Sequence, residues 1–137
     1  MKVYQDVFEI RTSKRTELID ITNKVEDMVN KSKIKKGICN VFTPHATAAV
    51  ILNENEPGLV KDIENKIRKD FPARSGYLHD RIDDNADSHL ASGFIGQSRT
   101  IPVKDNELLR GTWQQIFLLE LDGPRNSRNI VVTIIGE

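Results

Sequence analysis

This sequence of 137 residues has little of what marks disulfide-bonded or nucleic-acid-binding proteins. It contains one cysteine, and its 20 basic and 20 acidic residues cancel to a formal net charge of zero. A single cysteine excludes an internal disulfide and fits a reducing compartment. Without net positive charge, no whole-molecule field attracts nucleic acid, and one tryptophan and two tyrosines offer few surfaces for base stacking. We therefore expect no nucleic-acid partner.

Long apolar runs are also missing. No segment approaches the roughly 18 apolar residues that a membrane span requires, and the segment Met1–Asp6 lacks the apolar centre of a signal peptide. We expect no membrane partner and a cytoplasmic location. The length fits one domain over residues 1–137, which is enough chain to bury roughly 65–70% of its unfolded surface in one core.

The hydrophobic pattern predicts strands at both ends of the chain and two helices in the first half. Residues 57–70 form an apolar stripe at helical spacing behind Pro57, and a similar stripe begins near Asp20. The expected strands cover residues 3–12, 38–43, 47–52, 99–103, 112–121 and 129–135. This order predicts an α+β domain with a mostly antiparallel sheet, curled into a sandwich or half-barrel with two helices.

The last two predicted strands are apolar at successive as well as alternate positions. Ile116–Leu119 and Ile130–Val132 are examples. Such runs are typical of strands that are covered on both faces. We expect both to be covered on two faces, and another subunit is one candidate for the second cover.

The three histidines, His45, His79 and His89, all lie in polar or turn-like segments. Imidazole provides a metal ligand and a proton donor or acceptor near neutral pH, so we expect the three to meet in a shared pocket. His79 and His89 stand ten residues apart with acidic residues between them, inside a polar stretch over residues 73–96 that we interpret as ordered and functional, with a short helix over residues 90–95. Their spacing matches no compact zinc signature, so an acidic, solvated loop remains the alternative.

Other residues have two interpretations each. Glu54 and Glu56 precede a predicted helix, where a carboxylate is either a cap or part of a site. Arg125 lies in a turn, and it either binds a phosphate or is simply exposed. Trp113 is expected in the core or at a subunit interface, and Cys39 in the core rather than as a catalytic thiol.

Several motifs in this chain occur in the same order in the YjbQ-like family of small proteins, and the resemblance spans almost the whole sequence. These motifs are Thr-Pro-His-Ala-Thr-Ala-Ala at 43–49, Asn-Glu-Asn at 53–55, Tyr-x-His at 77–79, Asn-Ala-Asp-Ser-His at 85–89, the strand at 98–103, Gly-Thr-Trp-Gln at 111–114 and Asp-Gly-Pro-Arg at 122–125. Members of this family are also described as secondary thiamine-phosphate synthases. One departure is Asp84, where many relatives have glycine, and this residue is costly if the turn requires positive φ.

The resemblance implies an α+β sandwich, a homotrimer and a polar site near the subunit boundaries. The leading hypothesis is a transferase similar to thiamine-phosphate synthase, in which a thiazole phosphate displaces pyrophosphate from hydroxymethylpyrimidine diphosphate. The rival is a non-catalytic trimer that binds a metal or a small phosphorylated metabolite. We assign catalytic roles to His45, Asn85, Asp87 and His89, metal binding (zinc or magnesium) to His45, His79 and His89, and substrate or phosphate binding to Thr47, Asn53, Glu54, Gly111, Thr112 and Arg125.

Overall fold

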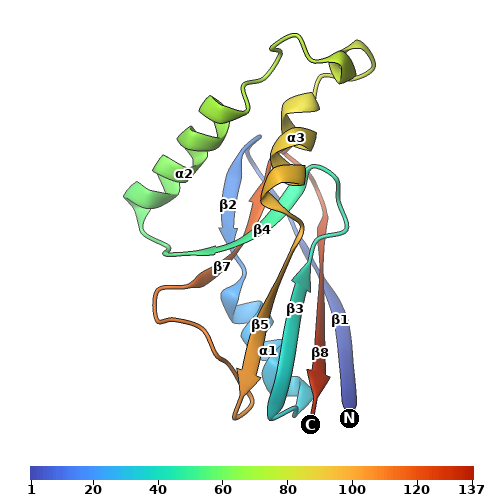
Figure 1. Ribbon diagram of the computed structural model, residues 1–137, viewed down its shortest axis with the longest axis vertical. Coiled ribbons are helices and arrows are strands. Elements are labelled where there is room, and N and C mark those ends of the chain that lie inside the picture. Colours follow the sequence, from blue (N-terminus) through green and yellow to red (C-terminus); the bar gives the residue numbers. More distant parts are fainter.

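The chain folds into two antiparallel sheets and three α-helices, and the computed structural model describes all residues, 1–137 (Figure 1). The larger sheet has the order β1-β8-β3-β5-β6, and the smaller sheet has the order β2-β7-β4. Every neighbouring pair of strands is antiparallel. The strands are β1 (Lys2–Ile10), β2 (Glu17–Asp20), β3 (Lys36–Phe42), β4 (Ala48–Asn53), β5 (Ser98–Lys104), β6 (Glu107–Leu108), β7 (Gln115–Glu120) and β8 (Arg128–Gly136). The predicted α+β class with a curled antiparallel sheet is confirmed.

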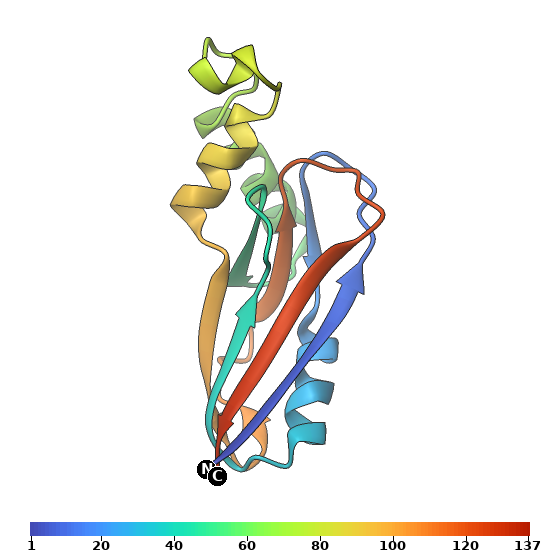
Figure 2. The same ribbon diagram turned by 90° about the vertical axis from the view of Figure 1, so that its right-hand side faces the viewer.

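The main core lies on the inner face of the larger sheet. Alternate residues of β8, such as Ile130, Val132 and Ile134, point inward and are fully buried. They meet the smaller sheet and helix α1 (Thr22–Ser32), which presents Val25 and Val29. Each such side chain contributes about 1.5–3 kcal/mol when it is removed from water. Figure 2 shows α1 on this inner side of the larger sheet.

A second, smaller cluster covers the outer face of the smaller sheet. Leu119 and Leu121, at and just beyond the end of β7, pack with Ala91 of helix α3 (Ala86–Ile95) and with Ile67 of helix α2 (Pro57–Asp70). As expected, β7 is therefore covered on both faces, and here the helices of the same chain supply the second cover. The outer face of the larger sheet has no such cover (Figure 1).

Helix α2 has the bounds that the sequence predicted. Glu56 caps it by accepting a hydrogen bond from the Gly58 N–H, Pro57 occupies the first turn, and Pro72 follows the helix. A third helix, α3, begins at Ala86 and spans ten residues, so it is longer than the short helix expected over residues 90–95. Its buried residues are mostly small, and they do not form the single apolar stripe that reveals a helix in a sequence.

Cys39 lies at the centre of β3 and is fully buried. Burial raises the pKa of its thiol to about 12, which excludes a thiolate nucleophile at neutral pH. The core interpretation of Cys39 is confirmed. No helix in the structure is both long and apolar enough to cross a bilayer.

Candidate functional site

Four segments meet at one end of the sandwich, which we call the histidine end: residues 11–16, 43–47, 77–89 and 121–127. Backbone hydrogen bonds tie them together, from Thr12 N to Arg125 O at 2.9 Å and from Gly123 N to Arg15 O at 3.1 Å. The hydroxyl of Ser88 on α3 donates to Leu121 O at 2.5 Å. Segments far apart in the sequence therefore bring polar side chains to one place.

A buried ion pair organises this end. Glu120 is 0% exposed and Arg128 is 3% exposed, and the guanidinium donates to the carboxylate from both Nε and Nη2. The Glu120 carboxylate also accepts hydrogen bonds from the Thr12 hydroxyl and from the Leu121 and Asp122 N–H groups. Burial alone would raise the pKa of Glu120, but these hydrogen bonds outweigh it and lower the pKa. Through these hydrogen bonds the pair anchors the segments that follow β1 and β7.

His45 is held against the end of β8. Its Nε2 accepts a hydrogen bond from the Asn129 N–H at 2.9 Å, which requires a lone pair on that nitrogen. Burial lowers the pKa of His45, and the charges of Arg128 and Arg125 lower it further against the opposing effect of Glu120. The ring is therefore neutral, and its Nδ1 carries the proton and is a hydrogen-bond donor. Nearby, the predicted phosphate ligand Thr47 is buried and accepts from Arg128 Nη2.

Two arginines and two aspartates form a second network at this end. Asp122 accepts hydrogen bonds from Arg125 Nη2 and from Asn85 Nδ2, both at 2.9 Å. Arg15 Nη2 contacts Asp87 at 2.9 Å, and its Nη1 lies 3.8 Å from Asp122. The structure thus brings together the predicted residues Asn85, Asp87 and Arg125. Both guanidinium groups remain nearly half exposed, so an incoming anion can reach them.

The other two histidines meet directly. The rings of His79 and His89 lie with centroids 4.8 Å apart at 74°, one on the short 3-10 helix η1 (Leu78–Arg81) and one on α3. They line a cavity of about 480 Å³ whose remaining walls are Tyr77, Leu78, Ala86 and Leu90. Two imidazoles bound to one zinc ion would place their ring centres about 5 Å apart, so this pair has nearly that separation.

Near this cavity, two buried acceptor oxygens, Oδ2 of Asp80 and Oδ1 of Asn85, have no hydrogen-bond partner. The other Asp80 oxygen accepts from the Ala86 N–H at the start of α3. No group of three or more His, Cys, Asp or Glu side chains is arranged to hold a metal ion within the chain. The expected convergence of three histidines is therefore realised for two of them, while His45 is directed to the backbone of β8.

A second group of predicted residues lies at the opposite end of β4. The strand pairs Ala48 with Glu120 at the histidine end and Asn53 with Gln115 at the other, so Asn53 and Glu54 lie about 17 Å away along the strand. Here Glu54 and Glu56 line a hollow together with Trp113, which is 69% exposed. The core interpretation of Trp113 is therefore wrong, and the interface interpretation remains. Within one chain these residues do not contact the histidines.

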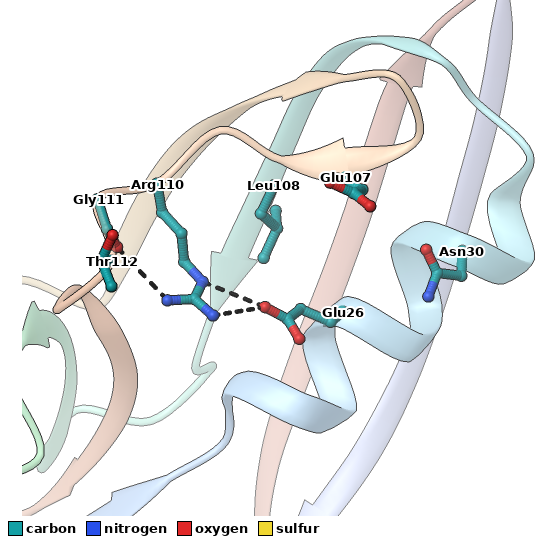
Figure 3. A pocket seen from close by; sticks show the side chains of 7 residues that line it. All are labelled: Glu26, Asn30, Glu107, Leu108, Arg110, Gly111 and Thr112. Carbon is teal, nitrogen blue, oxygen red and sulfur yellow. Dashed lines mark hydrogen bonds and ion pairs between the residues drawn. The ribbon is translucent and has the colours of Figure 1, made fainter.

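Gly111 and Thr112 also lie away from the histidines, in a loop that leads into β7. Arg110 donates to Glu26 of α1 through Nε and Nη2 and to the Gln114 backbone oxygen through Nη1. This brace holds the loop over a cavity of about 410 Å³, shown in Figure 3. The cavity is lined by Glu26, Asn30, Glu107, Leu108, Arg110, Gly111 and Thr112. The loop therefore presents Thr112 and Trp113 in a defined position.

Sequence reasoning missed several residues that build the histidine end, chiefly Arg15, Glu120, Asp122 and Arg128. One signal was present, because a lone carboxylate such as Glu120 inside the apolar run 116–121 must be paired to be buried. Asp84 does not have a positive φ, so its side chain causes no strain in the turn where relatives have glycine.

Comparison with known proteins agrees with this architecture. The family model described as "UPF0047 protein YjbQ-like" matches residues 6–137. A UPF0047 protein of Methanothermobacter thermautotrophicus is 47% identical over 137 residues, covering 100% of this chain and 95% of the relative. The crystal structure of a YbjQ-like protein of unknown function from Sulfolobus solfataricus P2 superposes with a TM-score of 0.98 at 50% identity, covering 99% of each chain. A YjbQ/UPF0047 family protein from Clostridium acetobutylicum gives a TM-score of 0.90 at 36% identity, covering 95% of this chain and 99% of that one. This chain therefore belongs to the YjbQ-like (UPF0047) family.

Proposed function

We propose that this protein binds a small phosphorylated metabolite at the histidine end, as a homotrimer, and that it catalyses a transfer similar to that of thiamine-phosphate synthases. The observation that carries the proposal is the placement of two half-exposed guanidinium groups, Arg15 and Arg125, at the same end as the His79–His89 pair. Guanidinium groups bind phosphate oxygens through paired hydrogen bonds, and the Nη1 of Arg125 has no partner within the chain.

The balanced charges of the arginines and aspartates at this end favour a phosphate that binds together with a divalent cation. Arg15 and Arg125 are balanced by Asp87 and Asp122, so the network alone has no excess positive charge for a dianion. A divalent ion would provide that excess. Imidazole suits zinc better than magnesium, and the His79–His89 separation fits two ligands of a zinc ion whose other positions are open to phosphate oxygens. Bound there, the metal would neutralise a departing pyrophosphate.

The chain's own residues have separate tasks in this proposal. Arg125 and Arg15 would orient the phosphate. Asp87 holds the Arg15 guanidinium directly. Asn85 donates to Asp122, and Asp122 in turn holds the Arg125 guanidinium. His45 is neutral and would donate a hydrogen bond to the substrate from its Nδ1–H. Asn53, Glu54, Gly111 and Thr112 lie at a distance within one chain, so we assign them to the part of the site that a neighbouring subunit contributes.

A binding experiment tests the site. Isothermal titration with inorganic pyrophosphate, with and without zinc, should give zinc-dependent binding that falls at least tenfold in Arg125→Met. Arg68→Met, an exposed arginine on α2, is the matched control and should bind as the unsubstituted protein does. Binding that is unchanged in Arg125→Met would contradict the phosphate assignment.

Metal content tests the histidine pair. Protein purified after zinc loading should lose bound zinc in His79→Ala and in His89→Ala, and His45→Ala tests whether the third histidine contributes. Equal zinc content in the two pair variants and the unsubstituted protein would overturn the metal assignment.

The alternative function is non-catalytic binding of a metal or phosphorylated metabolite by the same trimer. Steady-state turnover with hydroxymethylpyrimidine diphosphate and thiazole phosphate separates the two. Turnover that is lost in His45→Ala and His89→Ala supports catalysis, whereas pyrophosphate binding without turnover supports the alternative.

A further inference from the structure

A hollow that we call the tryptophan hollow lies at the end of β4 that is remote from the histidines. Its volume is about 270 Å³, and Trp113 in its wall is 69% exposed. The hollow is lined by Glu54, Asn55, Glu56, Pro57, Trp113 and Gln115, and no arginine, lysine or histidine is among these residues. Sites for small molecules commonly combine an aromatic wall with a few placed polar groups, as this hollow does.

The position of Trp113 is fixed by the turn that carries it. The Gln114 N–H donates to Gly111 O at 3.0 Å, and the Gly111 N–H donates to Gln114 Oε1 at 2.7 Å. Arg110 braces the turn, because it binds the Gln114 backbone oxygen and the Glu26 carboxylate. An indole on such a turn loses little conformational freedom when a ligand binds. The exposed ring is therefore a contact surface that exists before any ligand arrives.

The carboxylates around this indole have no cationic partner within the chain. Glu54 and Glu56 form no ion pair, and neither does Asp20 in the adjoining hollow. Glu56 is held in place by the Gly58 N–H at the start of α2. Asp20 accepts a hydrogen bond from Asn55 Nδ2 at 3.0 Å. Acidic groups that are gathered in this way produce a negative potential, which attracts a cation.

These groups suit an organic cation better than a metal ion or an apolar protein surface. A metal ion needs several converging ligand atoms, and no three His, Cys, Asp or Glu side chains provide them. An apolar surface placed here would bury the carboxylates of Glu54 and Glu56 without partners, which is destabilising. Lys24, the one cation that lines the adjoining hollow, lies 5.4 Å from the centre of the Phe8 ring and leaves these carboxylates unpaired.

We propose that the tryptophan hollow binds a small organic cation, a quaternary or protonated ammonium group, against the indole of Trp113 and beside the carboxylates of Glu54 and Glu56. The face of an indole attracts a cation more strongly than any other aromatic side chain does. The two carboxylates add a Coulomb attraction. Such a site goes beyond the proposed function, because it specifies the charge of the group that Glu54 contacts. It needs neither zinc nor the trimer, since one chain forms the hollow.

The first test uses the fluorescence of Trp113, the single tryptophan of the chain. Titration with choline should change this fluorescence in a saturable way. The uncharged analogue of choline, in which a tert-butyl group replaces the trimethylammonium group, has the same shape and should bind about tenfold more weakly. Equal affinity for choline and the analogue would overturn the proposal, because the hollow would then select for shape and not for charge. The absence of a saturable change with choline would overturn it as well.

The second test identifies the residues by isothermal titration with choline. Glu54→Gln removes one charge and keeps the shape, so it should weaken choline binding about threefold and leave binding of the analogue unchanged. Trp113→Leu should weaken choline binding about tenfold. Glu9→Gln, at an exposed glutamate on β1, is the matched control and should bind as the unsubstituted protein does.

Circular dichroism checks that each variant is folded. Choline affinity that is unchanged in folded Glu54→Gln and folded Trp113→Leu overturns the assignment of this hollow, and Glu54→Gln alone decides if Trp113→Leu does not fold. Zinc and pyrophosphate binding report separately on the histidine end. The proposed function can therefore fail while the tryptophan hollow still binds choline, and the reverse result is equally distinguishable.

Discussion

The outer faces of the two sheets differ, although the strands β7 and β8 beneath them are both rich in apolar residues. In the smaller sheet, β7 places Leu119 under α2 and α3, where it is fully buried. In the larger sheet, β8 places Val131 and Ile135 on a face that no helix covers. The helices that cover the smaller sheet come from the single connection between β4 and β5, residues 54–97. A strand that is apolar on both faces therefore indicates that both faces are packed against something. The connections between strands decide whether the same chain provides the helices that cover the second face.

The largest expected effect concerns the ion pair that joins the two sheets. Arg128→Met on β8 leaves the Glu120 carboxylate of β7 buried without its partner, which we expect to cost about 3–5 kcal/mol of the free energy of unfolding. Urea denaturation measures it. Arg125→Met, on an exposed arginine three residues earlier, should cost less than about 1 kcal/mol. Equal losses in the two variants would show that burial of the pair is unimportant.

The covered face comes next. Leu119→Ala should cost about 2–5 kcal/mol, because it removes a fully buried side chain and leaves a cavity beneath α2 and α3. Chemical denaturation followed by far-ultraviolet circular dichroism gives the value. If the loss is below 1 kcal/mol, the helices do not hold this face firmly, and the two faces are less different than the structure indicates.

The effect of a substitution on the uncovered face should depend on protein concentration. Val7→Thr exchanges an apolar for a polar side chain of similar shape, and at a residue that is 49% exposed it should cost less than about 0.5 kcal/mol in dilute, monomeric protein. If copies of the chain associate through this face, the same substitution should lower the thermal midpoint by several degrees at high protein concentration, because association stabilises the folded chain. A midpoint that is independent of concentration in both proteins would argue against association through this face.

The smallest effect is a dependence on pH. The pKa of His45 is lower in the folded chain than its ordinary value of 6.5, so below that pH the unfolded chain binds more protons and stability falls as pH decreases. Above about pH 7 the ring is neutral in both the folded and the unfolded chain, so its titration no longer lowers the free energy of unfolding. His45→Gln keeps an acceptor for the Asn129 N–H and removes the titration, so its thermal midpoint should change less between pH 7.5 and 5.5. An identical pH slope in both proteins would contradict this origin.

Much of the fold was predictable because its elements have regular patterns. The stripe behind Pro57 gave the bounds of α2, and the alternating residues of the last third gave β5, β7 and β8. Strand β2, with four residues, and helix α3, with small buried residues, lack such patterns and were missed or shortened. Short elements depend on tertiary contacts that a local pattern does not contain.

The candidate site was only partly predictable. Residue chemistry pointed to His79, His89, Asn85, Asp87 and Arg125, and the structure brings these to one end. The predicted strand over residues 47–52 already leads away from His45, and Asn53 and Glu54 indeed lie at the far end of β4. Arg15 was missed because its partners are more than seventy residues away and belong to no local motif.

The single cysteine can report when the larger sheet opens. Cys39 lies one residue from both Ile38 and Asn40, whose side chains point to the uncovered face, yet its sulfur is sealed inside with a pKa of about 12. A thiol-reactive dye should therefore modify it only when β3 separates from its neighbours. In the purified protein, the labelling rate would then report how often that separation occurs, without any engineered probe.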